Sequence, residues 1–394
     1  MKKPVLVIII VFVAVALIVG GLYLAGHWNK PLGESISMPT RTGESSSPEN
    51  PEPTSTSSNS TGEKTPTSVA TEPNKKLTPT TTLTPTEQQP VCGGPKIMYI
   101  LAMGVSDDDP DYLYGLADAI RVIRLDFVTP KVTVLTIPRD MWVEIPHDDI
   151  IEEKKASVPQ YQKINTAYFY GGQGMGYYEG PGNGPGLLAR TIALNYDLYV
   201  DHYVAINWQV FEDVIDAMGG VDVYLNEPID GRPKGQDDVN PYKQGQGYFP
   251  KGWNHLTGFD ALSFVRIRDR YTETIRTDNQ TILMCAVKEK LTRPEIITGV
   301  PKMISSLLEN MQTDLTLSQI RQLTCLLPKL EAENLQFVRF PDDWMVQGQE
   351  YDARLGGNTF VWDIPIEDVR EFYDAFEADT IPPVTDSGSN TTCP

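Results

Sequence analysis

Apolar residues run without a break from Val5 to about Gly26, near the amino end of the 394-residue chain. A membrane-spanning helix needs roughly 20 such residues. Lys2 and Lys3 precede the run and predict a cytoplasmic N-terminus by the positive-inside rule. A cleaved signal peptide is the alternative, but its apolar core is usually about 7–15 residues long and ends in an A-x-A-like site, which this run lacks. We therefore expect residues 1–28 to form a short cytoplasmic N-terminus and a single-pass membrane anchor, with the domain beyond it extracytoplasmic.

Polar residues dominate the next segment, from Asn29 to Pro90. It contains no Phe, Trp or Tyr, and it holds ten of the 31 prolines among many Ser and Thr residues. Such a sequence buries too little apolar surface to offset the entropy cost of ordering. We therefore expect residues 29–91 to be an extended, semi-stiff linker. It is either a stalk that holds a domain away from the membrane or a plain spacer.

Short apolar runs and helical periods alternate beyond the linker. Strands are predicted at 96–103, 119–127, 131–137, 202–206 and 221–225, with the second and third as a hairpin. Helices are predicted at 186–195, 209–218, 272–291, 295–310, 316–327 and 365–375, and a long loop at 226–255. This alternation predicts one α/β domain over residues 92–380, a mixed central sheet with helices on both faces. Residues 381–394 are expected to be a C-terminal tail.

The charge of the chain limits the partners it can have. There are 33 Lys and Arg residues against 52 Asp and Glu, a net charge of −19. Nucleic-acid binding by counterion release needs a basic face. We therefore expect no nucleic-acid partner.

Four cysteines occur, and neither a CxxC pair nor a zinc-like His/Cys spacing is present. In an extracellular domain an even number allows two disulfides. We expect Cys92, which opens the folded region, to pair with Cys393 near the end of the chain. Cys285 and Cys325, in two helix-like stretches, would form the second pair. Buried free thiols are the alternative.

Charged residues that interrupt apolar patterns mark a candidate site. Arg139 and Asp140 end a predicted strand, and ligands gather at strand ends in α/β sheets. The planar guanidinium of Arg139 suits phosphate oxygens, although a simple Arg139–Asp140 salt bridge is the plainer interpretation. Farther on, the segment Lys163-Ile164-Asn165 is typical of a helix start with Asn or Thr as the cap.

More arginines follow at suggestive spacings. Arg266 and Arg268 alternate with apolar residues and point the same way if that segment is extended. Arg276 and Gln280 follow on the next predicted helix at i and i+4, on one face. Like charges repel unless an anion lies between them, so these arginines and Arg139 could converge on a pyrophosphate. The alternative is a set of solvated arginines paired with nearby carboxylates.

These residues also carry a family resemblance. The chain resembles the LytR–CpsA–Psr family over roughly residues 96–292, in six segments in the family's order: TIPRD (136–140), KIN-A (163–167), DHYVAIN (201–207), DAMGGVDVYL (216–225), LTG-DAL-FVRIR (256–268) and R---Q (276–280). The resemblance implies a membrane-anchored phosphotransferase. Such a protein moves a glycopolymer from a polyprenyl-pyrophosphate carrier to peptidoglycan or another envelope acceptor, with Mg²⁺.

The resemblance also implies roles for individual residues. Asp118, Arg139 and Arg268 would be catalytic, and Asp118 would bind the metal. Pyrophosphate binding would fall to Arg139, Arg266, Arg268, Arg276 and Gln280. Such clustered positive charge is what phosphoryl transfer needs.

The metal site departs from the family pattern. Ser106 stands where the first of two aspartates is expected, and Leu116 replaces an arginine. Asp107, Asp108 or Asp109 could substitute after a small loop shift, or Mg²⁺ could be held weakly by Asp118, water and substrate phosphates. Three functions follow: a glycopolymer ligase, a non-catalytic binder of polyprenyl phosphates or wall polymers, and a surface adhesion or regulatory module. We favour the first.

Overall fold

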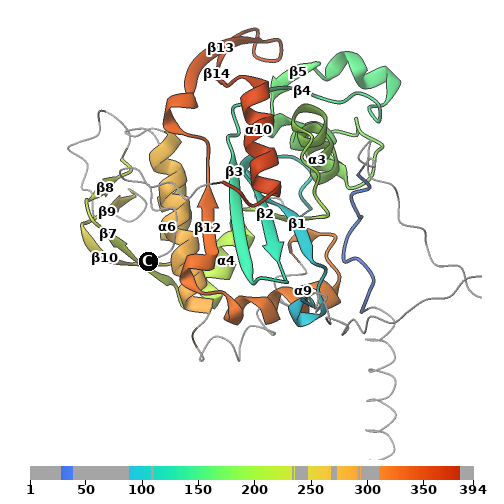
Figure 1. The fold of residues 1–394 in the computed structure, drawn as a ribbon. Coiled ribbons are helices and arrows are strands. Elements are labelled where there is room, and N and C mark those ends of the chain that lie inside the picture. Colours follow the sequence, from blue (N-terminus) through green and yellow to red (C-terminus); the bar gives the residue numbers. More distant parts are fainter. Residues whose placement is uncertain are drawn as a thin grey trace, which may run out of the picture. The chain divides into compact units, whose positions relative to one another are not determined.

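The structure is a computed structural model that describes residues 28–38, 88–107, 111–232, 235, 247–267, 273–291, 293 and 310–381. Its centre is a six-stranded mixed sheet in the order β11-β6-β1-β2-β3-β12. Figure 1 labels β1, β2, β3 and β12 of this sheet. The strands are β1 (Ile97–Val105), β2 (Ala117–Asp126), β3 (Lys131–Ile137), β6 (His202–Ile206), β11 (Gln312–Thr313) and β12 (Leu335–Val338). The pairs β1–β2 and β2–β3 are antiparallel, whereas β6 runs parallel to β1 and β12 parallel to β3. The predicted strands and hairpin are confirmed. Two short edge strands, β11 and β12, escaped prediction.

Helices cover both faces of this sheet, as predicted. On one face, α2 (Asn165–Gly171), α3 (Asn183–Tyr196) and α10 (Ile366–Glu377) share a core with Leu101 and Met103 of β1. On the other face, α6 (Glu273–Leu291) and α9 (Leu317–Leu326) belong to a core with Met98 and Ile100 of the same strand. This division follows from the two-residue period of a strand, which sends neighbouring side chains to opposite faces.

A third core lies between α4 (Trp208–Ala217), α5 (Gly258–Arg266) and a pair of antiparallel strands, β7 (Val221–Leu225) and β10 (Gly252–Leu256). Part of the predicted long loop is therefore a strand, since β10 buries Leu256 against β7. The extended interpretation of the segment around Arg266 is wrong. Thr257 caps α5 by accepting a hydrogen bond from the Asp260 N–H, and the helix runs to Arg266.

The remaining elements are short. They comprise β4 (Trp142–Glu144) with β5 (Tyr161–Lys163), β8 (Ile229–Asp230) with β9 (Tyr248–Phe249), the hairpin β13 (Val346–Asp352) with β14 (Gly357–Asp363), and the 3₁₀ turns η1 (Val91–Gly93), η2 (Glu152–Ser157), η3 (Leu327–Lys329), η4 (Ala332–Asn334) and η5 (Asp342–Trp344). The helix predicted at 295–310 lies almost wholly outside the described residues.

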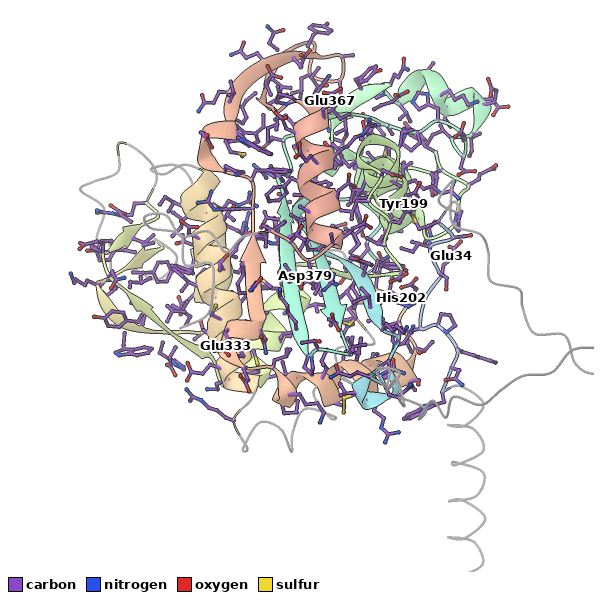
Figure 2. All side chains as sticks on the ribbon, in the orientation of Figure 1. Glu34, Tyr199, His202, Glu333, Glu367 and Asp379 are labelled. Atoms are coloured by element: carbon purple, nitrogen blue, oxygen red, sulfur yellow. A yellow bond between two sulfur atoms is a disulfide. The ribbon has the colours of Figure 1, made fainter. Side chains whose placement is uncertain are left out.

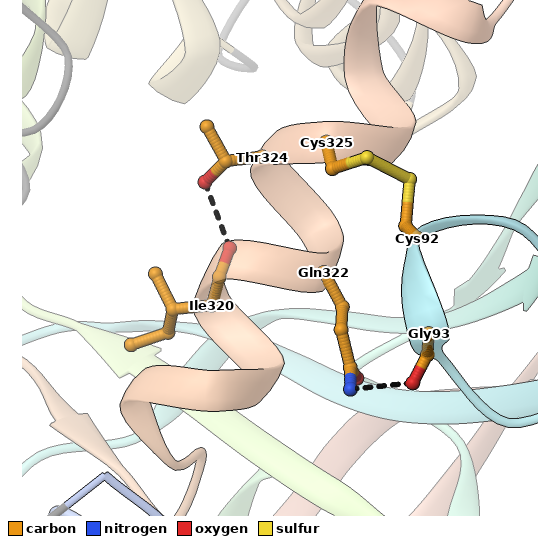
Figure 3. Close-up of a disulfide and its surroundings, with 6 residues drawn as sticks. All are labelled: Cys92, Gly93, Ile320, Gln322, Thr324 and Cys325. Atoms are coloured by element: carbon orange, nitrogen blue, oxygen red, sulfur yellow. Dashed lines mark hydrogen bonds between the residues drawn. A yellow bond between two sulfur atoms is a disulfide. The ribbon is translucent and has the colours of Figure 1, made fainter. Parts of the chain in front are cut away.

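One disulfide among the described residues joins η1 to α9 (Figure 3). Cys92 and Cys325 are 233 residues apart in sequence, with Cα atoms 5.8 Å apart. The predicted pairs Cys92–Cys393 and Cys285–Cys325 are therefore wrong. Packing of α9 on η1 brings these cysteines together, and position along the sequence carries no sign of it. Cys285 is also disulfide-bonded, and Cys393 lies outside the described residues.

The boundary of the predicted linker needs correction. Residues 28–38 belong to the fold: Ile36 is buried in the same core as α3, and Leu32 donates a backbone hydrogen bond to Leu315 (3.2 Å). The composition of the segment does not reveal this docking, because Ile36 is its one buried residue and the rest has the composition of a linker. In the described part of the chain, no helix has the length and apolar character needed to cross a membrane. The predicted anchor at 5–26 lies outside the described residues and stays a prediction.

Candidate functional site

A β-bulge at the start of β2 sets the position of Asp118. Gly104 of β1 pairs with Ala119, and Val105 pairs with Ala117, so Asp118 has no partner on β1. A bulge of this kind bends the strand and redirects the side chain of the extra residue. The Asp118 carboxylate is accordingly 32% exposed at the edge of a cavity.

Arg139 joins two carboxylates at this edge. Its Nη1 donates to Asp118 Oδ1 at 2.6 Å, and its Nε donates to Asp140 Oδ2 at 3.2 Å. Lys163 Nζ in turn donates to Asp140 Oδ1 at 2.7 Å. The Arg139–Asp140 salt bridge expected from sequence is therefore present. It is one link of a row of alternating charges, Lys163–Asp140–Arg139–Asp118, of which Arg139 and Asp118 line the cavity.

The KIN segment contributes to this row, although a plain helix cap was expected. Asn165 is the first residue of α2, and Ile164 occupies the cap position without a side-chain hydrogen bond. Asn165 Nδ2 instead donates to Asp118 Oδ1 at 3.3 Å. The cap interpretation is wrong because the amide side chain turns toward β2 and not toward its own helix.

Helix α6 brings a second arginine to Asp118. Arg276, which is 6% exposed, donates from Nη2 to the backbone oxygen of Asp118 at 2.6 Å. One turn later Gln280 accepts a hydrogen bond from Arg121 Nη2 and donates to the backbone oxygen of Val265 at 3.4 Å. Sequence reasoning missed Arg121, a buried residue of β2. A charged residue inside the apolar strand ADAIRVI was the signal available.

Of the two alternating arginines, Arg266 and Arg268, the structure describes only the first. Arg266 is the last residue of α5, and its guanidinium lies 4.2 Å from the centre of the Trp208 ring. That stacking holds an exposed arginine at the cavity wall. Arg268 lies outside the described residues.

Asp118 and the arginines around it line one cavity of about 370 Å³. Small residues on β1 and β2 leave room for it, because Ala102, Gly104 and Ala119 lie on the same sheet face. The rest of its wall is mainly apolar: Met103, Val105, Val204, Ile206, Trp208, Phe211, Leu262, Val265, Leu283 and Met284. The polar residues of its lining are Asp118, Arg121, Arg139, Asn207, Arg266, Arg276 and Gln280. A second cavity of about 30 Å³ adjoins the same arginines and is also lined by Arg339, Phe340 and Met345. The arrangement suits an amphiphile with an anionic head.

The donor groups around the cavity limit how a metal could bind. The Ser106 hydroxyl exchanges hydrogen bonds with the backbone of Leu116, both at 3.2 Å. Asp107 accepts the N–H of Tyr114 at 3.1 Å, whereas Asp108 and Asp109 lie outside the described residues. Among the described residues, the cavity lining contains one carboxylate, Asp118, and no group of three His, Cys, Asp or Glu could hold a metal. This donor set fits a magnesium ion that shares its ligands with substrate phosphates and does not fit an all-protein cage.

The fold and the site together define an α/β protein with arginines and one aspartate beside a largely apolar cavity. The model of the LytR_cpsA_psr family matches residues 55–368 of the chain. The chain belongs to this family.

Two curated relatives carry the name polyisoprenyl-teichoic acid–peptidoglycan teichoic acid transferase. TagV of Bacillus subtilis (strain 168) is 28% identical over 222 residues, which cover 56% of this chain and 50% of TagV. TagU of Oceanobacillus iheyensis is 29% identical over 226 residues, which cover 57% of this chain and 61% of TagU. The chain therefore spans about half to three fifths of the length of these relatives.

Solved structures agree on the fold. The crystal structure of B. subtilis TagV matches with a TM-score of 0.53 at 24% identity, over 73% of this chain and 99% of that one. A structure of TagT bound to LIIa-WTA matches with a TM-score of 0.52 at 19% identity, over 75% of this chain and 97% of that one. These likenesses confirm the mixed α/β fold.

Proposed function

We propose that this protein is a phosphotransferase that moves a glycopolymer from a polyprenyl-pyrophosphate carrier to peptidoglycan or another envelope acceptor. One observation carries the proposal: Arg139, Arg276 and Asp118 meet at one end of a largely apolar cavity. A pyrophosphate would lie on the arginines while the prenyl chain lies in the cavity. The transferase names of TagV and TagU agree with this assignment.

The reaction follows from the charges. An acceptor hydroxyl attacks the sugar-linked phosphorus, the bond to the bridging oxygen breaks, and polyprenyl phosphate leaves with the negative charge. Arg139 and Arg276 would stabilise that charge, which is the main task of a protein in phosphoryl transfer. When Arg139 turns from Asp118 to a phosphate oxygen, the Asp118 carboxylate becomes available to accept the proton of the hydroxyl. Magnesium, when held by Asp118 and the phosphates, would neutralise part of the phosphate charge.

The proposal includes the anchor at residues 1–28, with the N-terminus in the cytoplasm and the domain outside. Digestion of intact cells with a protease that cannot cross the membrane tests this topology. Cleavage of the Ser/Thr/Pro-rich segment is expected, and full protection of the domain would contradict it.

A non-catalytic binder of polyprenyl phosphates is the second candidate, because Ser106 removes one of two expected carboxylates. The two functions separate in one assay with full-length protein, a lipid-linked glycopolymer, peptidoglycan and Mg²⁺. Transfer that disappears in Asp118→Asn supports the ligase. Binding of the lipid without any transfer supports the binder, and absence of binding contradicts both.

A further inference from the structure

Residues 28–38, here called the strap, dock on one edge of the domain. The Ser318 N–H donates to the Trp28 carbonyl at 3.1 Å, and Leu32 donates to Leu315 at 3.2 Å. Between these contacts Pro31 forms an antiparallel bridge with Thr316. The start of the strap therefore lies beside β11 and the first turn of α9. Figure 1 shows the described part of the strap running along this side of the sheet.

The rest of the strap is also held by specific contacts with the domain. The Ile36 N–H donates to the buried Asp314 Oδ2 at 3.3 Å, and the Ile36 side chain is 8% exposed. Glu34 accepts a hydrogen bond from Asn183 of α3 at 2.8 Å and lies on the same side of the domain as His202 (Figure 2). A Cβ atom at Gly33 would lie 2.8 Å from the Thr313 carbonyl, so a side chain there would clash. The strap thus covers the β11 edge through contacts that a random linker would not make.

The strap comes directly after the predicted membrane anchor in the sequence. The predicted anchor ends at about Gly26, and Trp28 follows two residues later. Since a chain spans at most about 3.6 Å per residue, Trp28 lies within about 7 Å of the end of the predicted anchor, and the first turn of α9 is hydrogen-bonded to Trp28. Met38 and Gln89 belong to the same compact unit, so the chain reaches the domain before the Ser/Thr/Pro-rich segment begins.

We propose that the strap holds the α9–η1 face of the domain against an anionic lipid surface. The α9–η1 face comprises the strap start with Lys30, the turn η1, Lys96 just before β1, and α9 with Arg321. The proposal rests on the anchor in the proposed function. The Cys92–Cys325 disulfide and a hydrogen bond from Gln322 Nε2 to the Gly93 carbonyl (2.9 Å) make η1 and α9 one rigid surface.

The exposed cations of the α9–η1 face support an anionic lipid surface as its partner. Lys30, Lys96 and Arg321 are all exposed, on a chain whose net charge is −19. Cations beside a membrane anchor are attracted to anionic headgroups. Two exposed acids nearby accept hydrogen bonds that offset part of their charge: Asp201 accepts the Tyr99 N–H at 2.7 Å, and Glu34 accepts from Asn183 at 2.8 Å.

The direction of the cavity gives independent support. Met284 lines the cavity and shares a core with Met98 at the start of β1 and Leu326 of α9. Arg276, about two turns earlier on α6, contacts Asp118 at the opposite end of the sheet. The apolar end of the cavity therefore points toward the α9–η1 face and the arginines point away from it. A prenyl chain from the bilayer would meet the apolar end first.

The test uses full-length protein in nanodiscs that contain anionic lipid and a headgroup-attached quencher. A fluorophore is placed at Arg321→Cys on α9 or at Leu355→Cys, an exposed position in the β13–β14 turn. Strong quenching is expected at position 321 and little at position 355. Equal quenching at the two positions would overturn the proposal.

Two variants of different chemistry then release the strap. Ile36→Asp places a charge in the core, and Gly33→Val introduces the clash with Thr313. Each should abolish most of the quenching at position 321, with the near-ultraviolet circular dichroism of the domain retained. Leu32→Ser is the matched control, because Leu32 is 44% exposed and its hydrogen bond to Leu315 comes from the backbone, which the substitution keeps.

The outcomes separate the two proposals. Quenching that survives both strap variants overturns the role of the strap and leaves the anchor intact. Protein that fails to co-purify with nanodiscs overturns the anchor, and the strap proposal with it, while the transfer assay with Asp118→Asn still decides the enzymatic function.

Discussion

Asp118 and Arg139 form an ion pair, Oδ1 to Nη1 at 2.6 Å, that joins a bulge of β2 to the loop after β3. The pair keeps the arginine charge balanced in the free protein. The pyrophosphate of a substrate must therefore compete with Asp118 and Asp140 for the same guanidinium. This competition links substrate binding to release of the Asp118 carboxylate, and two predictions follow from it.

Arg139→Lys and Arg276→Lys should each weaken binding of a polyprenyl pyrophosphate. A lysine keeps the charge but cannot contact two oxygens as a planar fork. The loss of one charge-assisted contact is expected to cost on the order of 1.5–3 kcal/mol in affinity. Isothermal titration measures the affinity and thermal unfolding measures the melting temperature of each variant, with Arg321→Lys as the control. Unchanged affinity with a lowered melting temperature would assign these arginines a structural role.

Asp118→Asn should abolish transfer and leave lipid binding intact. The amide can still accept from Arg139, but it can neither take a proton nor hold Mg²⁺ well, so a loss on the order of 100-fold or more in rate is expected. Without Mg²⁺, the pyrophosphate should bind as tightly or more tightly, because a negative charge has gone. Transfer rate and affinity are measured beside Asp374→Asn, an exposed aspartate of α10. Full activity of Asp118→Asn would remove Asp118 from the mechanism.

Buried tyrosines should make the domain unstable in alkali. Desolvation by burial raises the pKa of Tyr112 and of Tyr178 to about 12, and it also raises the pKa of Tyr168, Tyr196, Tyr203 and Tyr373. An unfolded tyrosine loses its proton near pH 10, whereas these folded ones keep it. Stability is therefore fully present below about pH 10 and falls as the pH rises toward 12.

Urea unfolding at a series of pH values measures this fall. Tyr112→Phe is the informative variant, since its hydroxyl donates to Asn310 (2.8 Å) and accepts from Asn207 (3.0 Å). The variant should be less stable at neutral pH, yet its stability should fall less steeply above pH 10, by up to about 1.4 kcal/mol per pH unit. An identical slope in both proteins would show that Tyr112 titrates normally.

Loss of the Cys92–Cys325 disulfide should lower the free energy of unfolding by about 2–5 kcal/mol, since the crosslink closes a long loop in the unfolded chain. Cys92→Ser, Cys325→Ser and the double variant should all lose the same amount, because each breaks one bond. Peptide mapping without reductant should recover the Cys92–Cys325 pair. Recovery of a Cys92–Cys393 peptide would contradict the pairing.

Sequence predicts well those features that depend on local periodicity. The strands β1, β2, β3 and β6 and the helices α3, α4, α6, α9 and α10 all follow from spacing of apolar residues. Short elements such as β11 and β12 escape because two to four residues show no period, and their partners are far away in sequence. The strap was missed for the same reason, because Ile36 is its one buried residue and a single apolar position shows no period.

The same distinction separates the site residues that were predicted from those that were missed. Arg276 and Gln280 reach the cavity together because one helix carries both. The role of Asn165 was missed, since its partner Asp118 is on a separate strand and an Asn at a helix start is common as a cap. Arg121 was missed because its charge is buried between sheet and helix. The cysteine pairing failed because it depends on how α9 packs against η1, and four cysteines allow three connectivities.

A substitution in the cavity can separate recognition of the pyrophosphate from recognition of the prenyl chain. Ala102 of β1 is half-buried on the cavity wall, opposite Arg121 of β2. Ala102→Phe should place a ring in the space expected for the prenyl chain. Each buried CH₂ contributes about 0.8 kcal/mol, so excluding even two or three methylene groups should weaken binding of a long-chain lipid by one to two orders of magnitude.

A water-soluble sugar pyrophosphate without the chain should bind as before, because Arg139 and Arg276 are unchanged. Arg276→Lys is the matched converse and should weaken both ligands. The affinities of long-chain and chain-free ligands are measured for each variant, together with melting temperatures, which Ala102→Phe should leave unchanged or raise. Equal affinity of Ala102→Phe and the unaltered protein for the long-chain lipid would show that the prenyl chain lies elsewhere.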